Sequence, residues 1–239
     1  MAHFALIHGA CHGSWCWERV VPLLEAAGHR VQAPDLPGHG KDTAPMCALS
    51  LAEYGTAVGA LVAAAPEPVV LVGHSMAGAV VSRVAERMPD AIRRLVYLTA
   101  YLPKSGESLA SLARRDREAR TASERVEVDG TACFQITPEA ARDAFYQDAD
   151  PETVEFALQR IGPEPVSVFR ETADFTEARY GRVPRAYIHC TEDRAIGYTL
   201  QREMVRDTPC DPVATLTCGH SPFLTAPKAL AEALLPLGE

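Results

Sequence analysis

The chain has 239 residues, of which 47% are hydrophobic and 23% are charged, and its formal net charge is −8. This length and composition are ordinary for one large globular α/β domain with a well-buried core. The excess of acidic side chains argues against nucleic acid or an anionic membrane surface as a partner, because both carry negative charge.

The sequence shows no targeting, membrane, metal or redox signal. Residues 1–8 have no basic flank and no long apolar stretch, and no segment approaches the roughly 18 to 20 apolar residues of a membrane span. The seven cysteines form no C-x-x-C pair, and there is no H-x-E or paired-histidine motif. We therefore expect a cytoplasmic protein with reduced thiols, no metal and no cofactor.

Strands and helices are expected to alternate along the first hundred residues. Short, β-branched apolar runs predict strands, and apolar residues at helical spacing predict helices. The expected strands lie at residues 4–8, 30–33, 69–72 and 92–99. The expected helices lie at residues 15–27, 51–64 and 79–88. Such alternation is typical of a parallel sheet with helices on both faces.

The alternation stops near residue 102 and resumes near residue 179. Between these points we expect a charged helix over residues 114–125, a hairpin around Asp129-Gly130, and amphipathic helices over residues 138–145 and 151–161. We interpret residues 102–178 as a cap inserted into a core. The alternative is a surface excursion with no role in binding.

The core is expected to comprise residues 1–101 and 179–239. Its later elements are predicted strands at residues 185–190 and 213–216 and a final helix at residues 227–235. The sequence thus predicts a mostly parallel, doubly wound α/β sheet with one inserted cap.

A serine lies where a buried strand is expected to turn directly into a helix. Residues 73–78 are Gly-His-Ser-Met-Ala-Gly, and the small Gly73 and Ala77 allow the two backbones to pass close together. Ser75 would then stand on a strained turn above the sheet, beside the positive end of the helix. This context is typical of an activated nucleophile. The alternative is a glycine-rich connection with a surface serine.

A serine nucleophile needs a base, and the base needs a carboxylate to orient it. Two later strands end next to such residues: Asp193 follows the strand at residues 185–190, and His220 follows the strand at residues 213–216. The carboxyl ends of parallel strands meet at one edge of the sheet, so these side chains are expected to converge. The order Ser75, Asp193, His220 is that of the α/β-hydrolase triad. Glu192 is a rival for the acid.

The negative oxygen formed during acyl transfer needs two N–H donors. Met76, directly after the serine, is expected to supply one, and Ala10, in the loop after the first strand, the other. The alternative for Gly9-Ala10 is simply a tight turn.

These motifs resemble those of the α/β-hydrolase branch that includes the plant methylesterases and the plant (S)-hydroxynitrile lyases. The matching segments are residues 8–17, 35–40, 73–78, 101–103, 192–196 and 219–222. They extend over nearly the whole chain, and the resemblance implies an α/β-hydrolase fold. Two features depart from the family: Ala77 replaces the usual second glycine after the serine, and the inserted segment is rich in arginine, which leaves the substrate open.

The resemblance also implies a way to tell ester hydrolysis, the reaction of the methylesterases, from cyanide release, the reaction of the lyases. The lyases resemble one another in carrying a threonine in the first loop and a lysine just after the catalytic histidine. Here those positions are Gly9 and Ser221. Neither provides a positive charge for departing cyanide, so hydrolysis is favoured.

We therefore predict a serine hydrolase that cleaves a small-to-medium hydrophobic carboxylic ester through an acyl-enzyme, with this ester as its small-molecule partner. The residues expected to line the substrate pocket are Gly9, Cys11, Leu102, Phe134, Phe145, Tyr146, Phe156, Ser221 and Phe223. Three alternatives stay open: a lyase with the same triad, a biosynthetic catalyst acting on a polyketide-type ester, lactone or thioester, and a receptor-like binding protein. Whether the chain forms a homodimer also stays open.

Overall fold

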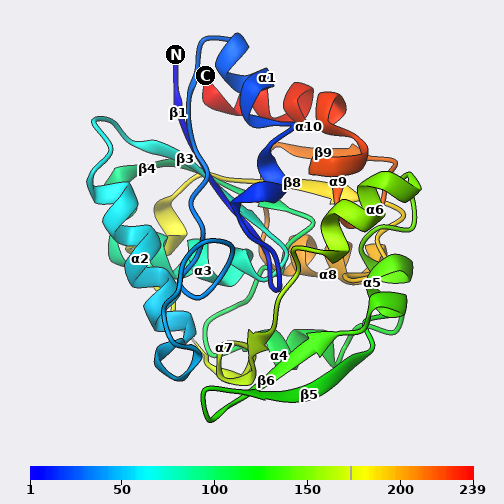
Figure 1. Cartoon of the computed structure of the whole chain (residues 1–239). Helices are drawn as coiled ribbons and strands as arrows, with labels where there is room; N and C mark the ends of the chain where they lie inside the picture. Colours follow the sequence, from blue (N-terminus) through cyan, green and yellow to red (C-terminus); the bar gives the residue numbers. More distant parts are fainter. Residues whose placement is uncertain (173) are drawn as a thin grey trace.

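A six-stranded parallel sheet forms the centre of the protein (Figure 1). The structure is a computed structural model that describes residues 1–172 and 174–239, without the side chain of Cys47. The strand order is β2-β1-β3-β4-β8-β9, and each neighbouring pair is parallel. The strands are β1 (His3–Ile7), β2 (Arg30–Gln32), β3 (Val69–His74), β4 (Ile92–Leu98), β8 (Arg185–Cys190) and β9 (Val213–Leu216). Every core strand predicted from the sequence is confirmed.

Helices cover both faces of this sheet. The core helices are α1 (Val21–Ala26), α2 (Leu51–Ala63), α3 (Ala77–Arg87), α8 (Tyr198–Asp207), α9 (Pro222–Thr225) and α10 (Pro227–Leu234). The 3-10 helices are η1 (Ser14–Trp17), η2 (Met46–Ala48), η3 (Pro89–Ala91), η4 (Tyr180–Arg182) and η5 (Leu235–Gly238). None of the helices in the described part of the chain has the length and apolar character that crossing a membrane requires.

Alternating side chains of the strands explain the two layers of helices. On β1, Phe4 and Leu6 belong to the same buried apolar cluster as residues of α1 and α10. Ala5 and Ile7 belong to the cluster that includes residues of α2, α3 and α8. Because successive strand residues point to opposite faces, a continuous apolar run can fill both layers.

Two core predictions need correction. The helix predicted over residues 15–27 is divided into η1 and α1, and Pro22 lies in the first turn of α1, where its missing N–H costs no hydrogen bond. Helix α8 was not predicted at all. The helices at α2, α3 and α10 are confirmed, with ends shifted by one or two residues.

Between β4 and β8 the chain leaves the large sheet. This region holds α4 (Leu109–Ala113), β5 (Ser123–Val128), β6 (Thr131–Ile136), α5 (Pro138–Ala144), α6 (Pro151–Leu158), β7 (Glu164–Pro165) and α7 (Val166–Arg170). Strands β5, β6 and β7 form an antiparallel sheet of their own. Figure 1 shows the region, in green, on the side of the large sheet toward which β1 runs. We call residues 102–178 the inserted segment.

The hairpin predicted within the inserted segment is confirmed. Asp129 and Gly130 connect β5 and β6 with φ values of 50° and 73°, the left-handed pair that a two-residue hairpin turn of type I′ requires. The charged helix predicted over residues 114–125 is wrong. Asp116 Oδ1 accepts the amides of Glu118 at 2.9 Å and Ala119 at 3.1 Å, so this backbone bonds to a side chain instead of continuing α4.

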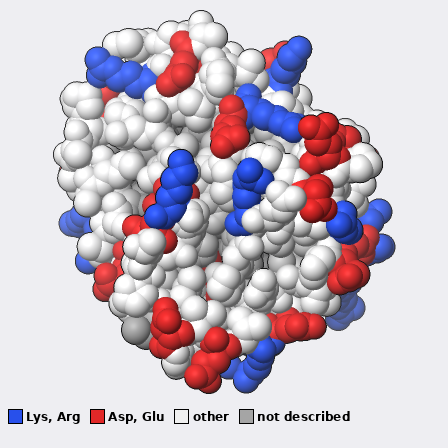
Figure 2. Space-filling model, in the orientation of Figure 1, with Lys and Arg blue, Asp and Glu red and all other residues white. Residues whose placement is uncertain are grey.

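Charged side chains are spread over the surface. On the face that Figure 2 shows, acidic and basic residues are interspersed, without a continuous basic area.

Candidate active site

Ser75 lies on a sharp turn between β3 and α3. Its φ of +55° is in the left-handed region, which is costly for a residue with a Cβ and is tolerated where the surrounding structure enforces it. The Ser75 carbonyl accepts the amides of Gly78 and Tyr101, each at 3.1 Å. A Cβ on Gly73 would lie 2.7 Å from the Ala77 carbonyl oxygen, so glycine is needed for strand and helix to pass. The predicted display of Ser75 above the sheet therefore matches the observed backbone.

A buried histidine–aspartate pair lies next to this turn. His220 Nδ1 donates a hydrogen bond of 2.7 Å to Asp193 Oδ2, and both side chains are almost fully buried. Asp193 Oδ1 accepts the amides of Ala195 at 2.6 Å and Ile196 at 2.9 Å. With Nδ1 donating, the other ring nitrogen of His220 carries the lone pair that a general base needs. Glu192, the rival acid, is exposed and does not bond to His220.

Thr99, which the motifs did not indicate, supports this pair. The hydroxyl of Thr99 donates to Asp193 Oδ2, and Thr99 itself has a left-handed φ of 36° directly after β4. Its position at the carboxyl end of a sheet strand was the available signal, because such positions commonly build sites in open α/β sheets.

His220 lies beside the nucleophile turn. The His74 ring, next to Ser75, lies 4.6 Å from the His220 ring between centroids, and His74 Nε2 donates to the His220 carbonyl at 2.9 Å. Phe145 stacks on His220 at 5.2 Å and lines the same pocket as Ser75. Within the described residues no hydrogen bond joins Ser75 to His220; such catalytic bonds are often long without substrate and tighten when it binds.

The loop after β1 supplies a second backbone donor. A Cβ on Gly9 would lie 2.8 Å from both Ser75 Cβ and His74 Nδ1, so the loop passes directly against the nucleophile turn. No acceptor within residues 1–172 and 174–239 takes the amide hydrogen of Ala10 or that of Met76. Ala10 lines the pocket together with Ser75. Two unpaired amides therefore flank the serine, the arrangement that an oxyanion hole requires.

The histidines of this loop are held neutral by burial. Burial lowers the pKa of His8 to about 3 and that of His12 to about 4. His12 Nδ1 donates to the Ala10 carbonyl at 2.8 Å, and the Tyr146 hydroxyl donates to His12 Nε2 at 2.8 Å. The neutral ring thus connects the loop to the inserted segment through one donor and one acceptor.

This neutral His12 gives a pH prediction. The free energy of unfolding is expected to fall as the pH decreases from about 6.5 to about 4, because His12 takes up a proton only in the unfolded chain. One such group contributes a slope of up to about 1.4 kcal/mol per pH unit. Urea titrations at a series of pH values measure this slope. The free energy of unfolding of His12→Asn is expected to depend on pH less steeply than that of the wild type, by that amount. Above pH 7 the two slopes should be equal, because the histidine is neutral in both the folded and the unfolded state. An equal slope in the two proteins below pH 6 would contradict the assignment.

The pocket beside Ser75 has a volume of about 260 Å³. It is lined by Ala10, Cys11, Ser75, Tyr101, Ala113, Thr121, Ser123, Phe134, Ile136, Phe145, Phe169, Ala195 and Ile196. Of the residues predicted to line it, Cys11, Phe134 and Phe145 do so. Gly9 lies behind it, against Ser75 and His74.

The other predicted pocket residues lie elsewhere. Tyr146 turns to His12, and Phe156 packs edge-on against the Trp15 ring. Phe223 fills the core against Trp17 and His74, and Leu102 and Ser221 are buried without lining the pocket. The direction of each of these side chains depends on the residues against which it packs. Nearness to a motif in the sequence does not predict those contacts.

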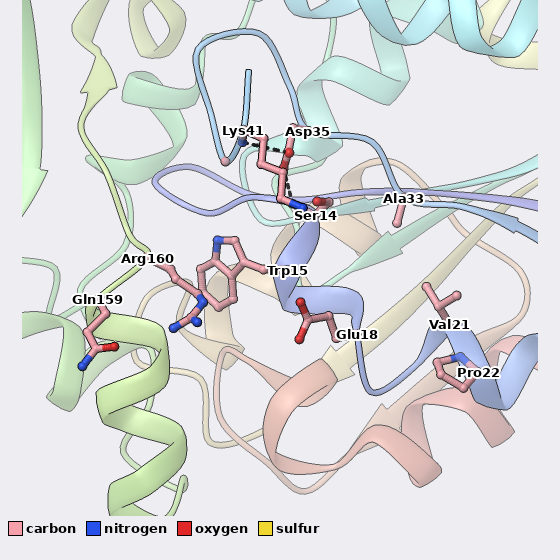
Figure 3. A pocket seen from close by; sticks show the side chains of 11 residues that line it. Ser14, Trp15, Glu18, Val21, Pro22, Ala33, Asp35, Lys41, Gln159 and Arg160 are labelled. Carbon is pink, nitrogen blue, oxygen red and sulfur yellow. Dashed lines mark hydrogen bonds between the residues drawn. The ribbon is translucent and has the colours of Figure 1, made fainter. Parts of the chain in front are cut away.

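A second, open groove of about 760 Å³ is lined partly by Ser14 and Trp15 of the residue 8–17 loop (Figure 3). Trp15 and Arg160 lie at one side of it, and Asp35 accepts the amides of Ser14 at 2.6 Å and Lys41 at 3.0 Å at its upper end. Neither Ser75, Asp193 nor His220 lines this groove. Ser75 lines the smaller, apolar pocket instead.

Comparison with known proteins agrees with this arrangement. The family model described as "Alpha/beta hydrolase family" matches residues 4–233. Methylesterase 2 of Arabidopsis thaliana is 34% identical over 253 residues, covering 99% of this chain and 96% of the relative. The crystal structure of polyneuridine aldehyde esterase is similar with a TM-score of 0.90 at 26% identity, covering all of both chains.

A bacterial structure is also similar. The pyrethroid hydrolase from Sphingobium faniae JZ-2 superposes with a TM-score of 0.83 at 30% identity, covering 99% of this chain and 97% of that one. Since the family model extends over nearly the whole sequence and the fold agrees throughout, the chain belongs to the α/β-hydrolase family.

Proposed function

We propose that this protein hydrolyses small, largely apolar carboxylic esters through an acyl-enzyme on Ser75. One observation carries the proposal: Ser75, in left-handed conformation, lines an apolar pocket together with Ala10 and Phe145, and Phe145 stacks on His220 of the buried histidine–aspartate pair. The backbone amides of Ala10 and Met76, on either side of this serine, have no acceptor within the described residues. The names of the relatives, methylesterases and esterases, support ester hydrolysis.

Each group has a role in two half-reactions. His220 takes the Ser75 proton as Oγ bonds to the ester carbonyl carbon, and the amides of Ala10 and Met76 stabilise the resulting oxyanion. The tetrahedral intermediate then breaks its bond to the alcohol oxygen, which leaves with the proton from His220. Water, deprotonated by His220, attacks the acyl-enzyme in the same way and releases the acid and the free serine. Asp193 holds the ring in the required tautomer and stabilises it when charged.

The pocket favours an apolar acyl or aryl group. Its aromatic side chains are Tyr101, Phe134, Phe145 and Phe169, and none of the described lining residues is charged. A cavity of about 260 Å³ suits a compact group. No lysine or arginine is among these lining residues, so a departing cyanide would find no permanent positive charge in the pocket wall, which disfavours cyanide release.

We also propose that residues 102–178 act as the cap over a core of residues 1–101 and 179–239. Seven lining residues come from this segment: Ala113, Thr121, Ser123, Phe134, Ile136, Phe145 and Phe169. Substrate choice would therefore depend mainly on the inserted segment, and chemistry on the core.

A substrate panel tests the function. Purified protein is incubated with methyl esters of aliphatic and aryl acids, p-nitrophenyl acetate, a lactone and an aromatic cyanohydrin, and products are identified by mass spectrometry. We expect free acid from the apolar esters and labelling of Ser75 by a fluorophosphonate probe, both lost in Ser75→Ala. Equal rates in the two proteins, or turnover of the cyanohydrin alone, would refute ester hydrolysis by this triad.

A further inference from the structure

The inserted segment places a fully buried carboxylate against the core. Glu164, in β7, has no exposed surface. It accepts hydrogen bonds from the Tyr54 hydroxyl at 2.9 Å, from His39 Nε2 at 2.9 Å and from the Cys11 amide at 3.2 Å. All three donors belong to the core: α2, the loop after β2 and the loop after β1. Acyl transfer as described above does not use this carboxylate.

His39 provides the opposite charge. Its two ring nitrogens both face oxygen acceptors, Nδ1 the Pro37 carbonyl at 3.0 Å and Nε2 the Glu164 carboxylate. Burial opposes the charge on this ring, but the charge and hydrogen bond of Glu164 together with the Pro37 carbonyl and Asp35 outweigh burial, so the pKa of His39 is raised. A buried carboxylate with a matched cation and two further donors is held firmly in one orientation.

This carboxylate fixes the peptide next to the oxyanion donor. The Ala10–Cys11 peptide donates through the Cys11 amide to Glu164, and its Ala10 carbonyl accepts from His12. The Cys11 carbonyl accepts the Gly162 amide at 2.9 Å. Cys11 has a left-handed φ of 65°, which a residue with a Cβ adopts only when its surroundings enforce it. Without Glu164, the strained turn would lose the acceptor of its own amide.

We propose that Glu164 is a positioning residue for the oxyanion hole. Its carboxylate holds the Cys11 amide and so keeps the preceding Ala10 amide aimed at the oxygen that becomes negative during acyl transfer. The inference rests on the proposed ester hydrolysis, since it concerns a donor used in that reaction. The inserted segment would thus control the core's chemistry as well as the shape of the pocket.

Kinetics of Glu164 variants with p-nitrophenyl acetate test the proposal. We expect Glu164→Ala to lower kcat and kcat/KM together by about 10- to 100-fold, less than the 100- to 1,000-fold typical for loss of an oxyanion donor. Affinity for an aryl trifluoromethyl ketone, whose serine adduct carries the oxyanion, should fall by the same factor. In Glu164→Gln, kcat and the affinity for the ketone should both lie between those of Glu164→Ala and the wild type, because the glutamine amide oxygen can still accept the Cys11 N–H.

Glu171→Gln is the matched control. Glu171 also joins the inserted segment to the core, since it accepts the Ala52 amide at 3.3 Å and pairs with Arg83 at 3.0 Å, but it does not contact the oxyanion loop. We expect its kcat and ketone affinity to equal those of the wild type.

Several results would overturn the positioning role. One is a folded Glu164→Ala protein with wild-type kcat and ketone affinity; another is a rise in KM alone, which would indicate pocket shape only. If Glu164→Ala does not fold, Glu164→Gln decides: a severalfold loss of kcat with an equal loss of ketone affinity supports the role, and wild-type values for both reject it. Wild-type protein without esterase activity would instead reject the proposed function itself.

Discussion

Replacement of Ser75 by alanine is expected to lower kcat for ester hydrolysis by about 10⁴- to 10⁶-fold, the range found when a triad nucleophile is removed. The reason is that Ser75 Oγ forms the covalent bond on which both half-reactions depend. The kcat of His220→Ala is expected to fall to a similar residual value, because the base acts only through the serine. The Ser75→Ala/His220→Ala double variant should then be no slower than either single variant. Steady-state kinetics with p-nitrophenyl acetate measure all three.

Ser50→Ala is the control for this series. Ser50 Oγ accepts a hydrogen bond of 3.1 Å from the Glu53 amide at the start of α2. Ser50 does not line the pocket. Its loss should lower the free energy of unfolding by about 1 kcal/mol and leave kcat unchanged. Additive losses in the double variant, or a Ser75→Ala protein within tenfold of the wild type, would show that the two residues do not act as one unit.

Gly9→Ala is expected to lower kcat by about 100-fold or more. The added Cβ would lie 2.8 Å from Ser75 Cβ and from His74 Nδ1, closer than a Cβ atom approaches other heavy atoms in proteins. Both neighbours belong to the tightly held nucleophile turn, so the loop must move instead, and the Ala10 amide moves with it. Loss of one oxyanion donor typically costs 10²- to 10³-fold. KM should change far less, because the oxyanion exists only in the transition state.

Gly59→Ala is the matched control for this substitution. Gly59 lies inside α2, and a Cβ there meets only Met88 Sδ, at an ordinary 3.5 Å. This change should leave kcat unchanged and stabilise the fold by up to about 1 kcal/mol, since alanine is the better helix former. A Gly9→Ala protein with wild-type kcat would mean that the loop does not supply the second donor.

The sheet and the positions of Ser75, Asp193 and His220 at its strand ends could be predicted because their signals are local. Apolar β-branched runs identified the strands, and Ser75, Asp193 and His220 each lie within four residues of the end of a predicted strand. Parallel topology then brings the strand ends together without any knowledge of packing. The turn at Asp129-Gly130 was predictable for the same reason, since its backbone conformation is encoded in two adjacent residues.

The pocket and its supports could not be predicted because they depend on contacts between distant parts of the chain. Tyr146 and Phe156 were expected in the pocket, yet each turns to a partner in the residue 8–17 loop. Glu164 stands between two prolines and looks like a surface residue. Its burial depends on donors at Cys11 and His39, more than a hundred residues earlier. Such long-range pairing leaves no periodic signal in the sequence.

The most direct measurement is the search for an acyl group on Ser75 during turnover. Wild-type protein is mixed with p-nitrophenyl acetate, quenched in acid during the burst of p-nitrophenol, digested with trypsin and analysed by mass spectrometry. An acetyl group is predicted on the peptide of residues 42–83, at Ser75. Rapid turnover with this peptide unmodified, or with the acetyl group on Cys11 of the same pocket, would contradict a serine acyl-enzyme.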